Sequence, residues 1–283
     1  MSTASQKQLT LLRKLKQKKH REQLGAFLAE GYHTIEQIVS NKKLKIDMLF
    51  IDFEHEKCEQ LDSLLASGLR ADLIYTTNKS IMKELSDTEH TSGWLAIVQI
   101  PKSYSLDRLL NAASVTSSAF ERKSKNYSTL ENDAVLIALD QIQDPGNMGT
   151  IIRTAVWFGV QGILLGEGCV DIWNPKVVRS TVGALGIVAH TIAKLEDSLM
   201  ECHKKGWNIM LLDGSEDAIR LSSELPNGPK VWVLGNESRG LSAHLKEIPE
   251  FIRYRIEQQN IGVESLNAAM AMGIALYRSV NFK

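Results

Sequence analysis

Residues 134–140 read Ala-Val-Leu-Ile-Ala-Leu-Asp, and residues 141–149 continue with Gln-Ile-Gln-Asp-Pro-Gly-Asn-Met-Gly. An unbroken apolar run that ends in an acid is typical of a buried parallel strand. Pro145 and Gly146 predict a turn after that strand, and residues 150–159 then predict a helix that ends at Gly159. Strand, polar loop and helix in this order indicate a parallel sheet whose ligands bind beyond the carboxyl ends of the strands.

The same alternation continues toward the C-terminus. Further strand-like stretches are predicted at 162–168, 186–192, 207–212, 230–235 and 251–256. A helix is predicted from Pro175 through Leu185, and a helix rich in small residues is predicted over 265–280. Alternating strands and helices predict an α/β domain with a parallel sheet that is covered on both faces.

Toward the N-terminus the pattern is that of a smaller α/β domain. Residues 9–40 predict one or two helices, and short apolar runs at 48–51, 73–75 and 94–100 predict strands. Residues 111–132 are rich in Ser, Thr, Asn and Lys, which indicates a linker or an exposed insertion. The predicted division is therefore a first domain over 1–105, a linker or insertion over 106–132 and a second domain over 133–283.

Length and composition agree with two folded domains. The chain has 283 residues, of which 43% are hydrophobic and 23% charged, so a largely disordered chain is excluded. No apolar run reaches the roughly 20 residues of a membrane helix, and the first residues lack the order of a secretory signal. The three cysteines, Cys58, Cys169 and Cys202, are scattered. These features predict a reducing, cytoplasmic location.

The formal net charge is zero, but residues 1–21 contain only basic charges. These are Lys7, Arg13, Lys14, Lys16, Lys18, Lys19 and Arg21. Such a stretch is either a solvated helix face or a contact surface for a polyanion such as nucleic acid. Charge alone leaves both interpretations open.

Three polar loops follow predicted strands. In the first, Asn147 is expected to cap the following helix and Arg153 lies about two turns inside it. In the second, Gly235 permits close backbone approach and Glu237 follows a strand end. In the third, Ser265 and Asn267 open the last helix. Each loop taken alone is also explained by capping, turns or an ordinary ion pair.

Other families of site are excluded by spacing. Leu241 and Ser242 stand where a Walker P-loop requires Lys and Ser or Thr, and no G-x-G-x-x-G follows the first strand of the second domain. His55 and Cys58 form half of a zinc motif without a second half. No G-x-S-x-G nucleophile elbow occurs. We therefore expect no metal ligands and no ordinary nucleotide-phosphate loop.

Taken together, the loops resemble a known family. ALDQIQDPGNMGTIIRTAVWFGV, VWVLGNESRGLS and IGVESLNAAMAMGIALY are similar, in this order, to the three motifs of the SpoU (TrmH-type) RNA 2′-O-methyltransferases of the SPOUT superfamily. NPKVVRSTVGAL between them also resembles that family. The N-terminal RKLKQKKHREQLGAFLAEGYHTIEQIV resembles its substrate-binding domain.

The resemblance implies a catalytic domain with a deep trefoil knot, binding of S-adenosylmethionine (AdoMet) in that knot, and a homodimer. The positions that match the cofactor-binding set are Leu234, Gly235, Ile256 and Leu266. The positions that match the catalytic set are Asn147, Arg153, Glu237, Ser265 and Asn267. One departure stands out, because the family's Ile-Pro-Met and short turn are replaced here by Ile256-Glu-Gln-Gln-Asn-Ile-Gly262.

The implied reaction is methylation of a ribose 2′-hydroxyl in structured RNA, with ribosomal RNA expected as the substrate. We expect phosphate contacts from the first domain at Lys14, Lys16, Lys18 and Lys19. The alternatives are an inactive RNA-binding protein with the same fold, which the altered loop at 257–260 would favour, and the same activity on transfer RNA.

Overall fold

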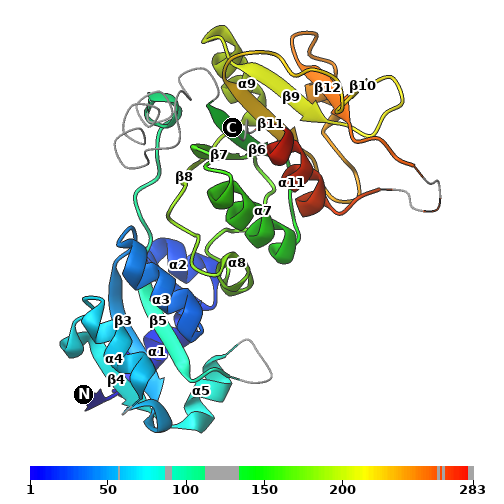
Figure 1. The fold of residues 1–283 in the computed structure, drawn as a ribbon. Coiled ribbons are helices and arrows are strands. Elements are labelled where there is room, and N and C mark those ends of the chain that lie inside the picture. The colour runs from blue at the N-terminus through cyan, green and yellow to red at the C-terminus, as the bar shows by residue number, and fades with distance from the viewer. Residues whose placement is uncertain (57, 87–90, 112–133, 260–261, 263–264, 280–283) are drawn as a thin grey trace. The chain divides into compact units, whose positions relative to one another are not determined.

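The computed structural model describes residues 1–56, 58–86, 91–111, 134–259, 262 and 265–279 (Figure 1). The chain forms two compact units. The first contains Met1–Lys102 together with Asp171–Ile187, and the second contains Ser103–Val170 and Val188–Lys283. The predicted domain boundaries remain a prediction, and the compact units group residues 103–105 and 171–187 differently.

The first unit contains a mixed sheet in the order β1-β4-β3-β5-β2. Its strands are β1 (Ser2–Thr3), β2 (Ala26–Glu30), β3 (Ile46–Asp52), β4 (Ile74–Thr77) and β5 (Trp94–Gln99). Its helices are α1 (Gln6–Leu15), α2 (Lys18–Leu24), α3 (Tyr32–Asn41), α4 (Glu59–Ala66), α5 (Lys79–Leu85) and α8 (Pro175–Thr181), with short 3-10 turns η1 (Phe53–His55) and η2 (Ala71–Leu73). Strand β5 runs antiparallel to both neighbours, so this unit is not a doubly wound parallel sheet.

Local sequence signals explain how the first helices begin and how they pack. Ser5 and Gln8 form a capping box at the start of α1, in which each side chain accepts a hydrogen bond from the other residue's backbone. Leu9, Leu12 and Leu15 then face the sheet and are at most 3% exposed. Together with α5 they bury one face of β2, β3 and β5.

The prediction of one or two helices over 9–40 is wrong in its middle. Strand β2 interrupts it and pairs antiparallel with β5, with Leu28 opposite Ile97. Gly25 ends α2 in the left-handed conformation (φ 60°) and Gly31 (φ 95°) separates the strand from α3. The residues of β2 are individually compatible with a helix, but all five are buried. Sheet pairing therefore outweighed local helix preference.

The second unit contains a seven-stranded sheet that is parallel throughout its described pairings, as predicted. Its order is β10-β12-β9-β11-β6-β7-β8. The strands are β6 (Val135–Leu139), β7 (Gly162–Leu165), β8 (Ala189–Ile192), β9 (Asn208–Leu212), β10 (Ile219–Arg220), β11 (Lys230–Leu234) and β12 (Ile252–Arg255). The helices are α7 (Pro145–Trp157), α9 (Leu195–Lys204), α10 (Ala243–Lys246) and α11 (Ala268–Ser279).

Alternate residues of the central strands face opposite layers. Val231 and Val233 join α9 and α10 in one core. Trp232 faces the other layer, where its indole Nε1 donates a hydrogen bond of 2.6 Å to Ser279 Oγ on α11. Helices α7 and α11 lie side by side in that layer (Figure 1). Two-sided burial explains why these strands read as continuous apolar runs in the sequence.

Several helix boundaries differ from those predicted, and α11 begins at Ala268 instead of Ser265. Asp144, not Asn147, caps α7, because its carboxylate accepts a hydrogen bond of 2.7 Å from the Asn147 backbone N–H. Pro145 therefore takes the first helical position, where its missing N–H costs nothing. Helix α8 ends at Thr181 instead of Leu185, since Val182 adopts a left-handed conformation.

The predicted linker lies almost entirely outside the described residues. Of the range 106–132, residues 106–111 are described, and they are helical. Leu109 and Leu110 from this turn are buried in the core of the second unit. Among the residues that the structure describes, no helix is both long and apolar enough to cross a membrane.

Candidate active site

The first two predicted loops lie beside each other at the carboxyl edge of the parallel sheet. Strands β6 and β11 are direct neighbours, with Leu139 opposite Leu234. The loops that follow them therefore leave the sheet at the same level. The backbone N–H of Asp140 donates to the carbonyl of Leu234 over 2.8 Å and continues the pairing into the first loop.

Glu237 in the second loop binds the first loop through its carboxylate. Oε1 accepts hydrogen bonds from the Asp144 backbone N–H (3.1 Å) and from Asn147 Nδ2 (3.2 Å). Oε2 accepts one from the Gln143 backbone N–H (3.3 Å). Partial burial favours the neutral acid, but these donors and the residue's own N–H outweigh it and lower the pKa of Glu237. The carboxylate is thus held ionised as an acceptor at neutral pH.

Asn147 connects this pair to the third loop. Its Oδ1 accepts a hydrogen bond of 2.8 Å from Asn267 Nδ2, across 120 residues of sequence. Asn267 Oδ1 accepts from the backbone N–H groups of Ala269 (3.0 Å) and Met270 (3.3 Å) at the start of α11. Asn267 therefore caps α11.

These contacts determine how both amides are turned. The helix N–H groups occupy Asn267 Oδ1, so its Nδ2 must donate to Asn147. The Glu237 carboxylate accepts only, so Asn147 must direct its own Nδ2 toward it. The chain Glu237–Asn147–Asn267, which we call the amide chain, joins the three predicted motifs by one continuous set of hydrogen bonds.

Gly235 is required by the shape of the second loop. A Cβ at this position would lie 2.2 Å from the backbone of Gly240 and Leu241. Asn236 and Gly240 exchange two backbone hydrogen bonds of 2.9 Å, which closes the loop on itself. Close approach was expected at Gly235, and the described partner is the chain's own backbone.

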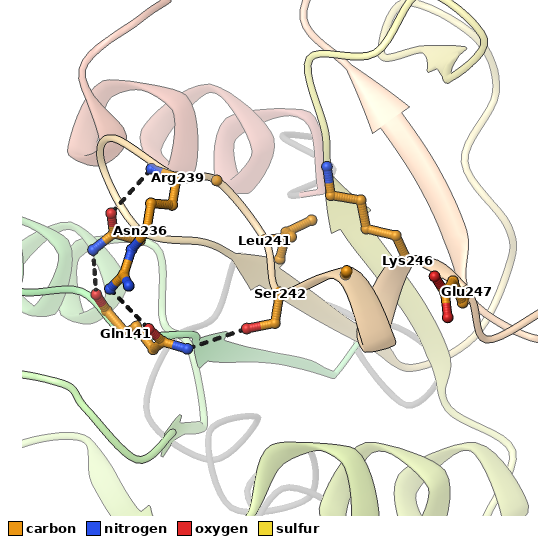
Figure 2. A pocket seen from close by; sticks show the side chains of 9 residues that line it. Gln141, Asn236, Arg239, Leu241, Ser242, Lys246 and Glu247 are labelled. Carbon is orange, nitrogen blue, oxygen red and sulfur yellow. Dashed lines mark hydrogen bonds between the residues drawn. The ribbon is translucent and has the colours of Figure 1, made fainter.

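A cavity of about 610 Å³ lies beside this loop (Figure 2). Gln141, Asn236 and Arg239 form one side, where Arg239 donates to Gln141 Oε1 over 2.9 Å, and Lys246 and Glu247 lie on the other. Gln141 and Arg239 are not among the predicted site residues. The sequence feature that could have indicated them is their place in the first two predicted loops. In the structure, Gln141 also has a positive φ of 59°. None of the four predicted cofactor residues lines this cavity.

Those four residues lie at the carboxyl ends of β11 and β12 and just before α11. Leu234 is buried, Ile256 is half-buried and Leu266 is 53% exposed. Arg255 precedes Ile256, and its Nε is buried without a hydrogen-bond partner in the described part of the chain.

The altered stretch after Ile256 is anchored at its first residue. Glu257 accepts hydrogen bonds from the Ser222 hydroxyl and from the Ser222 backbone N–H (3.2 Å). The Ser222 hydroxyl is the main cause of a lowered pKa at Glu257. Arg278 of α11 donates to the carbonyls of Leu221 (3.3 Å) and Ser223 (3.2 Å). A carboxylate contact thus holds Glu257, the first residue of the stretch that replaces the Pro-Met of the family that the sequence resembles.

Arg153 and Ser265 are outside the amide chain. Arg153 is exposed on α7, six residues beyond Asn147, and the helical repeat places it about 120° around the helix from that residue. Ser265 is exposed in the third loop, and the capping role considered for it belongs to Asn267. The structure therefore brings together three of the five predicted catalytic residues and places the other two on the solvent side.

The four predicted RNA-binding lysines lie in the first unit. Lys14 belongs to α1, Lys16 is its C-cap, and Lys18 and Lys19 begin α2. Lys16 donates to the Glu84 carbonyl over 3.2 Å, and Lys18 pairs with Glu22 at 3.7 Å. Arg21, from the same basic stretch, is buried and bonded within the unit. The four lysines are thus exposed or only weakly paired, and their contacts with RNA phosphates remain a prediction.

Within the described ranges, no three His, Cys, Asp or Glu side chains are grouped as a metal site would require. His55 contacts the Asp52 carboxylate instead, and Cys58 Sγ donates to the His55 carbonyl over 3.3 Å. The half-motif formed by His55 and Cys58 thus has a local structural explanation.

Comparisons with known proteins agree with this arrangement. The family described as SpoU rRNA methylase matches residues 134–277, and an MRM3-like substrate-binding domain matches residues 7–96. A tRNA/rRNA methyltransferase of Synechocystis that is described as uncharacterized is 31% identical over 95% of this chain and 88% of its own length. The 23S rRNA (guanosine(2553)-2′-O)-methyltransferase RlmP of Bacillus subtilis is 26% identical over 94% of this chain and 92% of its own.

Solved structures give the same result for the fold. An rRNA methyltransferase from Sinorhizobium meliloti is 25% identical, with a TM-score of 0.75 over 99% of this chain and 96% of that one. A structure of the S. meliloti rRNA methyltransferase with AdoMet bound has 24% identity and the same TM-score and coverage. With half of the sequence matched by the family and a relative above 30% identity along nearly its whole length, the chain belongs to the SpoU rRNA methylase family.

Proposed function

We propose that this protein transfers a methyl group from AdoMet to a ribose 2′-hydroxyl of structured RNA, with ribosomal RNA as the substrate. The amide chain carries the proposal, because it assembles the three motifs into one polar site at the ligand-binding edge of a parallel sheet. The B. subtilis relative, which is named for 2′-O-methylation of 23S rRNA, supports both the reaction and the substrate class.

The residues proposed to hold the cofactor suit its chemistry. Leu266 and Ile256 present apolar side chains that water still reaches, as a flat adenine requires. Leu234 and Gly235 lie where strand β11 ends, at the carboxyl edge of the sheet. The buried Nε of Arg255 lacks an acceptor among the described residues, and a polar group of a bound ligand would satisfy it. We also propose that the C-terminal segment forms the trefoil knot of the SPOUT superfamily.

The bound cofactor supplies an electrophilic methyl group on a sulfonium, so the reaction needs in-line attack by the ribose oxygen and loss of its proton. The amide chain is proposed to hold the ribose with Asn147, Asn267 and Glu237, whose orientations are already determined by one another. Ser265 adds a hydroxyl at the same loop. Alignment of reactants at about 3–3.5 Å can supply roughly 7–11 kcal/mol of the barrier.

Arg153 is proposed to bind phosphate or to stabilise the developing alkoxide. An arginine is ordinarily too basic to remove a proton at neutral pH, whereas its fixed positive charge stabilises an oxyanion. Arg153 shares a face of α7 with Trp157, four residues later. Its role therefore depends on what covers that face.

A second copy of this chain is the proposed cover. Trp157 is 84% exposed, and Met270 and Tyr277 on the neighbouring α11 are each 60% exposed. The Tyr277 ring lies 6.4 Å from that of Phe158, which links the two helices. Exposed apolar side chains on two packed helices indicate an association surface. Sedimentation should give a dimer for the wild type and a monomer for Trp157→Lys; unchanged dimerisation would contradict this surface.

The first unit is proposed to bind RNA phosphates through Lys14, Lys16, Lys18 and Lys19, and the location is proposed to be cytoplasmic. The three cysteines are free thiols, as a reducing compartment allows. Replacing all four lysines with glutamine should weaken RNA binding and flatten its salt dependence while AdoMet affinity stays unchanged. Unaltered RNA affinity at moderate salt would remove these lysines from the interface.

The decisive experiment uses radiolabelled AdoMet with ribosomal RNA from cells that lack the gene. The wild-type protein should deposit 2′-O-methyl groups at a discrete site, and Arg153→Ala should reduce transfer by about 10³-fold. AdoMet binding without methylation would support the alternative of an inactive RNA-binding protein. Methylation of transfer RNA alone would support the alternative of a transfer-RNA enzyme. Near-normal methylation by Arg153→Ala would exclude that residue from the mechanism.

A further inference from the structure

A second cavity, of about 430 Å³, lies in the first unit where β2 leads into α3. We call it the α3 pocket. It is lined by Glu30, Gly31, Tyr32, His33, Thr34, His55, Gln60, Ser92, Trp94, Arg179 and Val182. None of the predicted catalytic, cofactor-binding or lysine residues belongs to it. Its volume is within the range of cavities that bury a small planar ligand.

Four rings form the aromatic part of the α3 pocket. Trp94 is 1% exposed and forms a buried base. Tyr32 and His55 contact it edge-on, with ring centroids 5.4 Å and 5.2 Å from that of the indole. His33 is 83% exposed and lies edge-on to Tyr32 at 5.5 Å. The rings thus run from a buried base to an exposed one, and flat ligands stack on such surfaces.

His55 is held in place from behind. Its Nδ1 contacts the buried Asp52 carboxylate, which leaves Nε2 as the ring nitrogen not engaged there. Gly93 makes room for this pair, since a Cβ would lie 2.5 Å from Asp52 Oδ2 and 2.8 Å from His55 Cε1. A packed pair with one ring nitrogen uncommitted is a prearranged hydrogen-bonding group.

Arg179 supplies an unsatisfied donor. Its Nη1 is buried and lacks a hydrogen-bond partner within the described residues, although it lies 3.5 Å from Glu30 Oε2 as an ion pair. A buried N–H without an acceptor is costly. Gly31 also begins α3 without a side-chain cap, so backbone donors of its first turn lie at the same wall. The pocket therefore combines stacking surfaces with donors that require acceptor atoms.

We infer that the α3 pocket receives one unpaired ribonucleotide of the RNA substrate. The base stacks among His33, His55 and Tyr32, and its ring or carbonyl acceptors bind Arg179 Nη1. Glu30 offsets the charge of Arg179, so shape and acceptors, more than net charge, select the ligand. Unpaired bases splayed into aromatic pockets are the usual source of sequence recognition in RNA. This inference rests on the proposed function, because that function makes RNA the substrate.

The test measures binding of the full-length protein to labelled RNA by fluorescence anisotropy. The probes are single-stranded r(A), r(C) and r(U) oligomers of about eight nucleotides and a blunt RNA duplex of about 16 base pairs. Wild-type protein should discriminate among the oligomers. His33→Ala and Arg179→Gln should weaken the preferred one about tenfold, as loss of one stacked or hydrogen-bonded base predicts, and change duplex affinity less than about twofold. Matched controls are His244→Ala and Arg70→Gln, both at exposed positions.

Wild-type affinity of His33→Ala for every oligomer would overturn the inference, as would equal weakening of the duplex. His33 is too exposed for its replacement to affect folding strongly, so this variant can be interpreted even if Arg179→Gln is unstable. Methyl transfer and AdoMet calorimetry are measured in parallel. If His33→Ala transfers the methyl group with an unchanged KM for RNA, the α3 pocket does not bind the substrate, and the enzyme proposal is unaffected. If His33→Ala loses oligomer binding while the wild-type protein transfers no methyl group, the result would support the pocket and contradict the enzyme proposal.

Discussion

The two units use their polar side chains for different tasks. In the first unit, Arg21 is 3% exposed and donates to the Leu15 and Lys16 carbonyls and to Asp171, so one side chain holds the corner between α1 and α2. In the second unit, Glu237, Asn147 and Asn267 connect three loops at a rim that solvent reaches. We therefore expect the buried polar contacts of the first unit to contribute mainly to stability, and the contacts at the sheet edge of the second unit to contribute mainly to activity.

The largest expected effect is on the stability of the first unit. Arg21→Met leaves two carbonyls and the Asp171 carboxylate without their donor, so the free energy of unfolding should fall by about 3–5 kcal/mol. Urea denaturation measures this change. AdoMet affinity should stay the same, because the described hydrogen bonds of Arg21 all lie within the first unit.

The matched control for this prediction is Arg70→Met. Arg70 pairs with Asp72 on the surface, with 72% of its side chain exposed, and such pairs contribute between about 0 and 1 kcal/mol. Equal losses for the two variants would show that burial does not distinguish these ion pairs.

The next largest effect is a loss of activity with little change in stability. Asn147→Ala interrupts the amide chain at its centre, and kcat/KM should fall by about 10²–10³-fold, the usual cost of one positioned hydrogen-bonding group in a transition state. The melting temperature should move little, because Asn147 is only half-buried. Steady-state methyl transfer and thermal melting measure the two quantities, with the exposed Asn227→Ala as control. Loss of stability in proportion to activity would instead assign the chain a structural role.

A buried histidine in the second unit, His190, is expected to affect stability in a pH-dependent way. Burial lowers the pKa of His190 from 6.5 to about 4. The unfolded chain therefore binds a proton below pH 6.5 that the folded chain accepts only near pH 4. The free energy of unfolding should fall across this window by about 3 kcal/mol, and His190→Gln should lack that part of the fall. Denaturation curves at pH 7, 5.5 and 4.5 measure it, and His33→Ala should behave as wild type. Parallel curves for all three proteins would contradict the burial effect.

The smallest expected effect concerns the anchored loop of the second unit. Glu257→Ala removes the contact with Ser222 and should weaken AdoMet binding on the order of fivefold by calorimetry. Because the pKa of Glu257 is lowered, the contact is complete above the ordinary range of a glutamate and weakens as pH falls below it. Glu224→Ala, at an exposed glutamate of the same unit, is the control. Unchanged affinity would show that the contact between Glu257 and Ser222 does not support AdoMet binding.

The parallel sheet was the part of the fold most fully predicted from sequence. Its strands are buried on both faces, and their apolar runs therefore mark them without reference to any partner. Strand β2 was missed for the converse reason, since Ala26–Glu30 becomes a strand only by pairing with β5. The cap of α7 was assigned to Asn147 instead of Asp144, because both residue types cap helices and only the geometry distinguishes them.

For the site, the sequence determined the residue types and their order in three loops, because these depend on local composition and turn chemistry. Which of those residues meet depends on how the chain folds, since Asn147 and Asn267 become partners through strand order and helix packing across 120 residues. The same holds for Arg179, which enters the α3 pocket only because segment 171–187 packs with the first unit. Contacts between distant segments depend on the topology of the fold, and a local sequence pattern does not determine that topology.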